Sequence, residues 1–342
     1  MSATIAPSPL DPDPEGWPVL VTGAGGFVGG HIARRLAEAG HRVRGLSRKP
    51  PVERPGDPAV EWIIGDLRDA EARRRGVAGV RGVIHSAAWV SLGRDRQGVS
   101  RAVNVDATRR LLDDARNFGA ERFVLTSTLH TLAAGTSRAP ADENALWNLE
   151  CVESPYSRTK REAEDVVRAA TGGDGFTTIV LCPGMVLGPR DLKPTSTLLV
   201  RTMARHRVVF TPGGGIPIVD ASVVASAHRR ALILGESGTR YAIVGEYLSY
   251  PDLARLTAEV AGRPKLILGV PNLLERPLTA TADMLTRLGL TLELSGPTVA
   301  GGFLRLHVTG ERADRCFGLV HPPAVESIRS ALDSAVGGRR RL

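Results

Sequence analysis

The stretch Val19-Leu-Val-Thr22-Gly23-Ala-Gly-Gly26-Phe-Val-Gly29-Gly30 decides how the first half of the chain is expected to fold. An apolar run typical of a buried strand leads into a glycine-rich turn, and an amphipathic helical pattern follows over residues 31–39. A strand that turns directly into a helix places the helix N-terminus, with its unpaired N–H groups and partial positive charge, beside the turn. Glycines there let a phosphate approach the backbone and let the helix pack close to the sheet. The stretch is therefore typical of a dinucleotide-binding unit, which holds a pyrophosphate at that helix end.

The glycines are spaced Gly23-x-x-Gly26-x-x-Gly29, which differs from the G-x-G-x-x-G form. Glycines in a turn usually have only a backbone role, so it is the strand before them and the helix after them that favour cofactor binding. The residues that we expect to contact the cofactor here are Gly23, Gly25, Gly26, Phe27, Val28 and Gly29.

The composition is that of an ordinary globular protein. The 342 residues are 42% hydrophobic and 23% charged, enough for one large α/β domain and a smaller lobe. Cys151, Cys182 and Cys316 are scattered and odd in number, which argues against a disulfide framework and fits a reducing, cytoplasmic compartment. No cysteine or histidine spacing suits a metal, and no apolar run reaches the ~18 residues of a membrane-spanning helix. We expect no metal and no membrane span.

The net charge of +8 raises the question of a nucleic-acid partner. The arginines are mostly interleaved with acids along predicted helices, and only 73–75 and 339–341 form runs. We therefore expect solvated faces and no nucleic-acid partner, with part of the positive charge serving an anionic cofactor. Residues 1–16 hold four prolines between acids and lack the basic start and apolar core of a signal peptide, so we expect a disordered leader.

Strand and helix patterns alternate through the first half of the chain. Strands are predicted at 19–22, 42–46, 61–64, 83–85, 122–126 and 177–181, with long helices at 99–118 and 157–170. Strands separated by helices predict right-handed crossovers and an α/β fold with a doubly wound parallel sheet, a Rossmann domain. Shorter elements follow: helices at 195–205 and 223–234 and strands at 218–220 and 241–244.

The alternation fades after Pro183, where prolines and glycines become frequent. We place the cofactor domain at 17–186 and 217–246, a smaller, mainly helical substrate lobe at 187–216 and 247–336, and a basic tail at 337–342. The lobe should sit over the carboxyl ends of the strands, where open α/β sheets bind their ligands.

The end of the second strand bears on the choice of cofactor. An NAD enzyme is expected to place an acid there for the ribose 2′-hydroxyl, whereas this chain has Ser47, Arg48 and Lys49. Basic side chains suit a 2′-phosphate, although they could instead cap a solvated turn. We favour NADP(H) and keep NAD(H) as the alternative.

Two further strand ends supply candidate cofactor contacts. Asp66 follows the third strand and either accepts from the adenine amino group, with Leu67 against the ring, or caps the next helix. Small residues follow the fourth strand and leave room for the adenosine, namely Ser86, Ala87 and Ala88.

Tyr156 and Lys160 open the second long helix, after Pro155. A spacing of four places both side chains on one face, about one turn apart. The pKa of a tyrosine is ordinarily near 10, and proton exchange near pH 7 needs a pKa lower by roughly 3 units, about 4 kcal/mol. A lysine ammonium and an oxidised nicotinamide ring can together supply this, and the lysine can hold the nicotinamide ribose. Elsewhere such a pair is an ordinary surface pair; behind a dinucleotide turn we expect it to be catalytic.

Hydroxyl groups follow the fifth strand in Thr126-Ser127-Thr128-Leu129-His130. A hydroxyl at a strand end can hydrogen-bond the substrate oxygen and position it for Tyr156. We choose Thr128, with Ser127 second, and expect the other to satisfy local backbone groups. His130 either lines the substrate pocket or is a plain loop histidine.

Over nearly all of 18–335 the sequence resembles the extended short-chain dehydrogenase/reductase superfamily, the NAD-dependent epimerase/dehydratase group. The matching motifs are Thr22-Gly-Ala-Gly-Gly-Phe-Val-Gly29, Gly65-Asp-Leu67, His85-Ser-Ala-Ala88, Asn104-Val-Asp-Ala-Thr108, Thr126-Ser-Thr128, Tyr156-x-x-x-Lys160 and Pro183-Gly-Met-Val-Leu-Gly-Pro189. The segment from Pro183 to Thr195 is similar to the dihydroflavonol-reductase-like and 3β-hydroxysteroid-dehydrogenase-like branch.

The resemblance implies roles for particular residues. Thr128, Tyr156 and Lys160 would be catalytic, and Asn104 would lie on the helix that supports the lysine through water. Thr126 is expected near the cofactor, and the backbone of Pro183, Gly184, Met185 and Val186 is expected to meet the nicotinamide carboxamide. Thr128 stands where serine is commoner and keeps the hydroxyl, and Ala107 replaces a usual glycine.

The branch implies an NADP(H)-dependent reduction of a ketone or aldehyde, or oxidation of the alcohol. The alternatives are a nucleotide-sugar epimerase or dehydratase with tightly bound NAD, and a non-enzymatic NADP-binding sensor. The lobe is apolar, so we expect a small apolar carbonyl substrate in a pocket lined by Trp89, Leu129, His130 and Met185. The two long helices pair across a dimer in many relatives of this superfamily, which makes a homodimer plausible.

Overall fold

The apolar strands predicted in the first half form the centre of a seven-stranded parallel sheet. The computed structural model describes residues 16–51, 55–90, 95, 98–172, 175–191, 196–288 and 295–339, and its strand order is β10-β6-β5-β4-β1-β2-β3. The strands are β1 Pro18–Thr22, β2 Arg42–Ser47, β3 Glu61–Ile64, β4 Gly82–His85, β5 Arg122–Thr126, β6 Thr177–Pro183 and β10 Thr239–Ile243. Thr22, the last residue of β1, pairs with Leu46 of β2 and with His85 of β4. The strand ends therefore meet along one edge.

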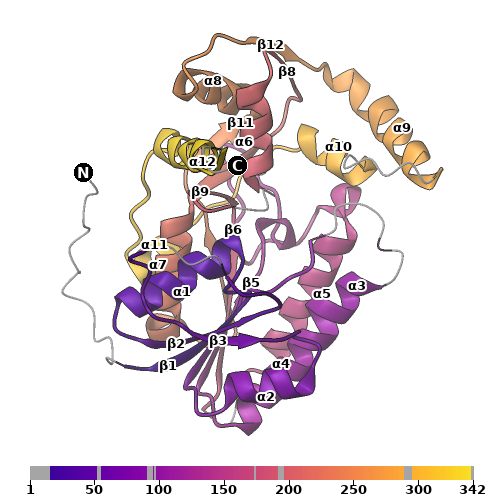
Figure 1. The fold of residues 1–342 in the computed structure, drawn as a ribbon. Helices are drawn as coiled ribbons and strands as arrows, with labels where there is room; N and C mark the ends of the chain where they lie inside the picture. Colours follow the sequence, from indigo (N-terminus) through magenta and orange to yellow (C-terminus); the bar gives the residue numbers. More distant parts are fainter. Residues whose placement is uncertain are drawn as a thin grey trace.

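Helices cover both faces of this sheet (Figure 1) because its strands are apolar on both sides. In β1, Leu20 packs into one core, whereas Val19 and Val21 pack into the other. The first core lies under α2 Ala70–Val77, α4 Ala107–Asn117 and α5 Pro155–Ala169, and the second under α1 Phe27–Glu38, α7 Ala221–Leu234 and α11 Glu311–Phe317. The predicted doubly wound α/β fold is confirmed.

The helix predicted at 99–118 differs from expectation, because a π-helical turn interrupts it. Its parts are α3 Val99–Arg101, the π-helix η1 Ala102–Asp106 and α4 Ala107–Asn117.

Helix α2 was not predicted, since its sequence is short and rich in arginine. Arg73 of that helix is 5% exposed, and its guanidinium donates to the Asp114 carboxylate and to the carbonyl of Leu67. One arginine of the 73–75 run is therefore buried and hydrogen-bonded inside the protein, whereas we expected it to be solvated.

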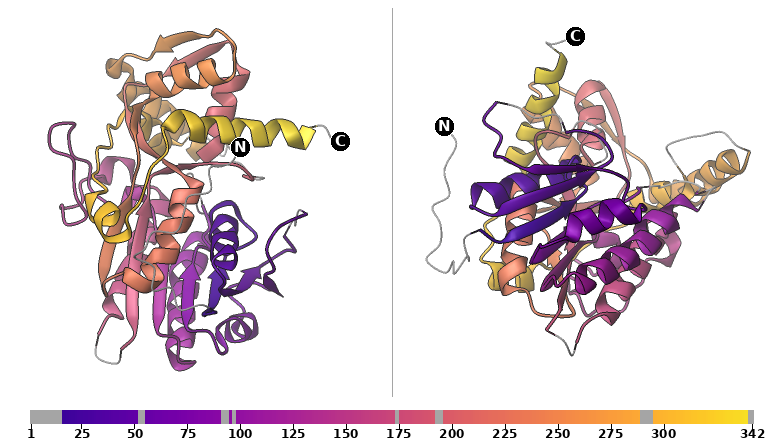
Figure 2. Two further views of the ribbon diagram at one scale, coloured as in Figure 1. Left: turned by 90° about the vertical axis from the view of Figure 1, so that its left-hand side faces the viewer. Right: turned by 60° about the horizontal axis from the view of Figure 1, so that its bottom comes forward.

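The remaining elements form a lobe above the carboxyl edge of the sheet (Figures 1 and 2), and it contains more strand than we expected. Its small sheets are β11-β9-β7 and β12-β8. The elements are η2 Leu129–Thr131, η3 Glu150–Val152, β7 Met185–Leu187, α6 Ser196–Arg205, β8 Val208–Thr211, β9 Gly215–Asp220, β11 Tyr247–Ser249, α8 Tyr250–Val260, β12 Leu266–Gly269, η4 Asn272–Leu274, α9 Glu275–Arg287, α10 Gly296–Phe303 and α12 Ala324–Arg339. The strand predicted at 218–220 belongs to β9 and pairs with β7, not with the main sheet.

Helix α12 continues to Arg339, past residue 336 where we expected the lobe to end. The leader, apart from Gly16, and residues 340–342 of the predicted tail lie outside the described residues. All three cysteines are free. Within the described ranges no helix is long and apolar enough to span a membrane, and no cluster of three histidine, cysteine or acidic side chains could hold a metal.

Candidate active site

The glycine turn after β1 leaves the start of α1 open to a ligand. Gly23 has a positive φ of 70°, and its carbonyl accepts from the N–H of Gly26 over 2.8 Å. Gly26 is the N-cap of α1; it offers no side-chain cap, and the first turn holds no acid. A Cβ on Gly29 would lie 2.3 Å from the Gly23 oxygen, so only glycine permits this packing. An uncapped helix N-terminus beside a tight glycine turn fits a dinucleotide pyrophosphate.

The end of β2 lies directly beside this turn. A Cβ on Gly25 would lie 2.3 Å from the Ser47 hydroxyl oxygen. Arg48 and Lys49 are exposed, and the Arg48 guanidinium lies 6.0 Å from the centre of the Trp89 ring. This contact places Trp89 beside the basic end of β2, and its predicted place in the substrate pocket stays a prediction.

The carboxylate of Asp66, just after β3, is paired with the side chain of Arg68. Its carboxylate accepts from the backbone N–H of Arg68 over 2.9 Å and from that guanidinium over 2.9 and 3.0 Å. The hydrogen bonds from Arg68 lower the pKa of Asp66 to about 2. The helix-cap interpretation of Asp66 is wrong, because Asp69 caps α2. Leu67, expected against the adenine ring, is 6% exposed and packs in the core.

A buried chain of hydrogen bonds, which we did not predict, runs from the end of β4 to η1. The N–H of Ala87 donates to the Thr22 hydroxyl, which lies 2.7 Å from Nδ1 of His85. Nε2 of His85 lies 2.8 Å from the Thr108 hydroxyl, which donates to the Asn104 carbonyl. Burial lowers the pKa of His85 to about 3, so this ring is neutral. It connects Thr22, at the end of β1, to Thr108, just after the π-helical turn. Thr22 and Thr108 both stand in predicted motifs, but only the fold brings them to one histidine.

Asn104 acts through neighbouring groups. Its side chain, 2% exposed, accepts from the N–H of Trp89 over 2.7 Å and donates to the Trp89 carbonyl and the Thr159 hydroxyl. These bonds hold the loop after β4 against α5. The contact on α5 is Thr159, the residue before Lys160. The geometry makes Asn104 a positioning residue.

Tyr156 lies in the first turn of α5, which begins with a reciprocal cap. The Ser154 hydroxyl accepts from the N–H of Ser157, the Ser157 hydroxyl accepts from the N–H of Ser154, and Pro155 occupies the first helical position. The Thr128 hydroxyl hydrogen-bonds to the Tyr156 hydroxyl. Burial raises the pKa of Tyr156 to about 12, and the bond from Thr128 opposes only part of this rise. The pKa thus moves upward in this structure, whereas we expected it to fall.

The Lys160 ammonium is bound at the end of β5. The side chain is 3% exposed, and Nζ donates to the Thr126 carbonyl over 2.6 Å. Burial lowers the pKa of Lys160 to about 8, and the carboxylate of Glu164 opposes that fall. Ser127 donates its hydroxyl to Glu164, so of the two candidate hydroxyls it is Thr128 that meets Tyr156.

Glu164 is a site residue that sequence reasoning missed. It is 3% exposed and lies one helical turn after Lys160 on the same face of α5. One carboxylate oxygen accepts from Ser127 and lies 3.6 Å from the thiol of Cys182, and the other lies 3.6 Å from Nη1 of Arg240. The spacing of four from Lys160 was the signal available in the sequence.

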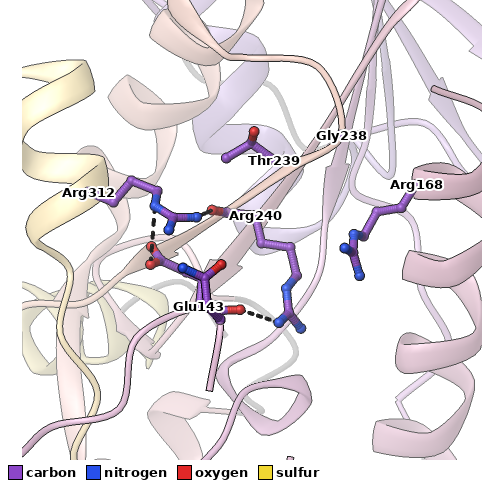
Figure 3. Close-up of a pocket in the computed structure, with 7 residues that line it drawn as sticks. Glu143, Arg168, Gly238, Thr239, Arg240 and Arg312 are labelled. Carbon is purple, nitrogen blue, oxygen red and sulfur yellow. Dashed lines mark hydrogen bonds and ion pairs between the residues drawn. The ribbon is translucent and has the colours of Figure 1, made fainter. Parts of the chain in front are cut away.

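Arg240 in turn belongs to an outer ionic layer (Figure 3). Its guanidinium donates to the Glu143 carbonyl, and Arg312 pairs with the Glu143 carboxylate at 3.5 Å. The other Glu143 oxygen accepts from the N–H of Ala242 on β10. The loop that carries Glu143 and helix α11 are thereby held to the sheet edge behind Glu164.

A family model named NAD dependent epimerase/dehydratase family matches residues 19–240, about two thirds of the chain. The chain belongs to this family. The predicted membership of the extended short-chain dehydrogenase/reductase group and the predicted class of enzyme, an NAD(P)-dependent oxidoreductase, are confirmed.

Relatives of this epimerase/dehydratase family member share much of its length. Sterol demethylase protein B of Methylococcus capsulatus is 33% identical over 78% of this chain and 82% of its own length. A putative dihydroflavonol 4-reductase of Synechocystis is 31% identical over 72% and 73%. The crystal structure of gox2253 superposes with a TM-score of 0.81 at 28% identity, covering 95% of this chain and 99% of that one.

The structure places the other predicted residues as follows. The Thr126 hydroxyl lies 2.8 Å from Nε2 of His228, so its side chain faces α7 and not the cofactor. Leu129 is 1% exposed and fills the core beneath the site, which gives it no open surface toward a substrate. His130 is half-buried, two residues after Thr128, and its Nδ1 lies 3.5 Å from the Thr128 hydroxyl; its place in a substrate pocket stays a prediction. The remaining predicted residues flank the strand ends; Pro183, Met185 and Val186 are buried, Gly184, Ser86 and Ala87 are half-buried, and Ala88 is exposed.

Proposed function

We propose that the protein is an NADP(H)-dependent reductase that converts a ketone or aldehyde of a small apolar substrate into the alcohol. The observation that carries the proposal is the convergence of Thr128, Tyr156 and Lys160 at the carboxyl edge of the sheet, beside the open start of α1. The two elements that supply these side chains, the loop after β5 and helix α5, are fixed by the cap at Ser154 and by Asn104.

The preference for NADP(H) rests on charge at the end of β2. Ser47 touches the glycine turn, and Arg48 and Lys49 follow it on the exposed side. The acid on the neighbouring strand, Asp66, is already paired with Arg68. A guanidinium at this place can hold a 2′-phosphate through charge-assisted hydrogen bonds, whereas residues 42–51 offer a ribose 2′-hydroxyl no carboxylate.

The chain's own residues perform the proton chemistry. The reduced nicotinamide, when bound, supplies the hydride that the carbonyl carbon needs. Tyr156 donates its phenolic proton to the carbonyl oxygen as negative charge develops there, and Thr128 hydrogen-bonds the same oxygen and orients it. Lys160, held at the Thr126 carbonyl, supplies a positive charge behind the tyrosine and a donor for the ribose.

The charge states favour reduction over oxidation. A Tyr156 pKa of about 12 keeps the phenol protonated throughout the physiological range. A protonated phenol is the form that a general acid needs, whereas alcohol oxidation requires the phenolate. Lys160, with a pKa of about 8, is mostly an ammonium at pH 7.

The apolar side chains of the lobe support the proposal that the substrate is apolar. Met185, one of the predicted pocket residues, belongs to the apolar core of the lobe. The most similar relatives include one named for sterol demethylation. We therefore propose a sterol-like or otherwise apolar carbonyl compound as the substrate class.

Titration of the protein with NADPH and with NADH, followed by nucleotide fluorescence, tests the cofactor assignment. We expect tighter binding of NADPH, and an Arg48→Ala variant should lose roughly 10- to 100-fold of the affinity for NADPH while NADH binding changes little. Arg255→Ala, on the exposed face of α8, is the matched control. Preference for NADH, or NAD that co-purifies and does not exchange, would overturn the assignment and favour the epimerase alternative.

A further inference from the structure

The exposed apolar side chains of this protein are concentrated in one part of the lobe. Among the described residues, sixteen large apolar side chains are exposed, and nine of them lie between residues 208 and 288. They are Val208, Phe210, Leu266, Leu268, Leu273, Leu274, Leu278, Met284 and Leu288. Soluble monomers rarely expose a contiguous apolar surface of this kind without a partner for it. We call these nine residues the lobe tip.

Four of the nine residues form one face of the β8–β12 sheet. The strands are parallel, and Val208 pairs with Leu266 while Phe210 pairs with Leu268. Neighbouring strand residues point to opposite faces, so these four side chains share the outer face. The intervening Val209 packs into the lobe core, whereas Phe210 is 67% exposed. Nothing in the described chain covers this outer face.

Helix α9 continues the apolar surface. Leu274 and Leu278 are four residues apart, as are Met284 and Leu288, so both pairs fall on one stripe of the helix. A Cβ on Gly213, two residues past β8, would lie 2.7 Å from the side chain of Asn272, so η4, which leads into α9, lies against the segment that follows β8. Figure 1 shows α9 projecting from the body and joined to β12 by a short segment.

The charges around the lobe tip are mainly positive. Arg207 and Lys265 immediately precede the paired strands, and Arg205, Arg263 and Arg276 are exposed nearby in the sequence. Neither strand contains an acid, and Asp283 of α9 accepts from the N–H of Gly296. The nearby acids Glu259, which is exposed, and Glu275, which is half-buried, are fewer than these basic residues. An apolar surface with a basic border complements a membrane that carries anionic headgroups.

We propose that the lobe tip docks this protein on an anionic lipid membrane. A flat apolar sheet face and an apolar helix stripe can enter the boundary between headgroups and acyl chains, while the arginines meet lipid phosphates. Helix α9 packs on α10, and α10 packs on η3. Since η3 ends four residues before Tyr156, the docked surface would be linked to the active site through α10 and η3, and an apolar substrate could pass along this side from the bilayer. This last point rests on the proposed function, whereas membrane binding does not.

Co-sedimentation of the full chain with lipid vesicles, without cofactor or substrate, tests the proposal independently of catalysis. We expect binding to phosphatidylcholine vesicles that contain phosphatidylglycerol, weaker binding to pure phosphatidylcholine, and loss of binding as salt is raised. The double variant Phe210→Ser/Leu268→Ser should abolish binding. Arg207→Gln/Arg263→Gln should weaken it by about 30-fold, from about fivefold per basic residue. Leu146→Ser, at a side chain that is 91% exposed outside the lobe tip, is the matched control.

Two results would overturn the proposal. Either the wild-type protein fails to sediment with anionic vesicles, or Leu146→Ser lowers binding as much as the lobe-tip variant does. A concentration-dependent dimer, seen by light scattering and broken by Phe210→Ser/Leu268→Ser, would assign the surface to a second copy of the chain instead. Unchanged circular dichroism and melting temperature establish that each variant is folded. Vesicle binding without turnover of any ketone would leave the docking surface standing and reject the proposed reaction.

Discussion

Replacing Glu164 by glutamine is predicted to move the pH at which the reductase loses activity. In the native site the ammonium of Lys160 is deeply buried, and the carboxylate of Glu164, one turn away, favours its charged form. Glutamine keeps the size of the side chain and can still accept from Ser127, but it removes the negative charge. It also leaves the charge of Arg240, 3.6 Å from the carboxylate, without its buried partner. Both effects lower the pKa of Lys160.

The size of the shift follows from the geometry of the helix. Side chains four residues apart are about 6 Å apart, and unit charges at that distance interact by about 3 kcal/mol at an effective dielectric constant near 20. That is about 2 pKa units, and because Arg240 already offsets part of the carboxylate's charge, we expect between about 1 and 2. The Lys160 pKa would fall from about 8 to about 6 or 7. At pH 7 the charged fraction, and with it the rate of reduction, should fall roughly 2- to 10-fold.

The assay is the pH dependence of kcat for ketone reduction at saturating NADPH. The wild-type rate should decline above about pH 8, as Lys160 loses its proton, and the decline should begin at lower pH in Glu164→Gln. At pH 5.5 the two rates should converge, which a merely misfolded variant would not do. Asp165→Asn, an exposed neighbour on α5, is the control and should follow the wild-type profile. Superimposable profiles for wild type and Glu164→Gln would refute the reasoning.

Three further substitutions test other parts of the site. Thr128→Val should lower kcat roughly 100-fold with little change in melting temperature. Ser127→Ala should destabilise the fold by about 1–3 kcal/mol and largely retain kcat. Equal effects of the two variants on kcat would contradict the choice of Thr128 as the catalytic hydroxyl. Gly29→Ala should abolish nucleotide binding in a fluorescence titration, because its Cβ would lie 2.3 Å from the Gly23 oxygen; normal affinity would contradict the packing. Arg190→Gln, which breaks the 2.7 Å ion pair between Arg190, after β7, and Asp57, before β3, should speed NADPH release several-fold in stopped flow, and an unchanged rate would show that this ion pair does not hold the cofactor in place.

The parts of the molecule that depend on local pattern were predictable from the sequence. Apolar strands separated by helical segments specify the main sheet, and the glycine turn with its flanking strand and helix specifies the open end of α1. The spacing of Tyr156 and Lys160 on one helix places them together without any knowledge of the fold. The short strand β7 was less visible, because it is stabilised by pairing with β9, about 30 residues further along the chain.

The parts that depend on contacts between distant segments were not predictable. Glu164 meets Arg240 across 76 residues, and His85 joins Thr22 to Thr108 from three different elements. The direction of the Tyr156 pKa also depends on the fold, because burial of the phenol raises it and the spacing of Tyr156 and Lys160 does not show that burial. A sequence shows which groups can titrate, but their burial and partners are set by the fold.

The central claim is that Tyr156 donates a proton during NADPH-dependent reduction of an apolar carbonyl. The most direct measurement is NADPH consumption by wild type and Tyr156→Phe with a panel of apolar ketones, keto-steroids among them. Phenylalanine keeps the ring and its packing and removes only the hydroxyl. The account predicts turnover of at least one ketone by the wild type, a loss of kcat of roughly 10³-fold in Tyr156→Phe, and an unchanged dissociation constant for NADPH. Wild-type turnover by Tyr156→Phe would contradict the account.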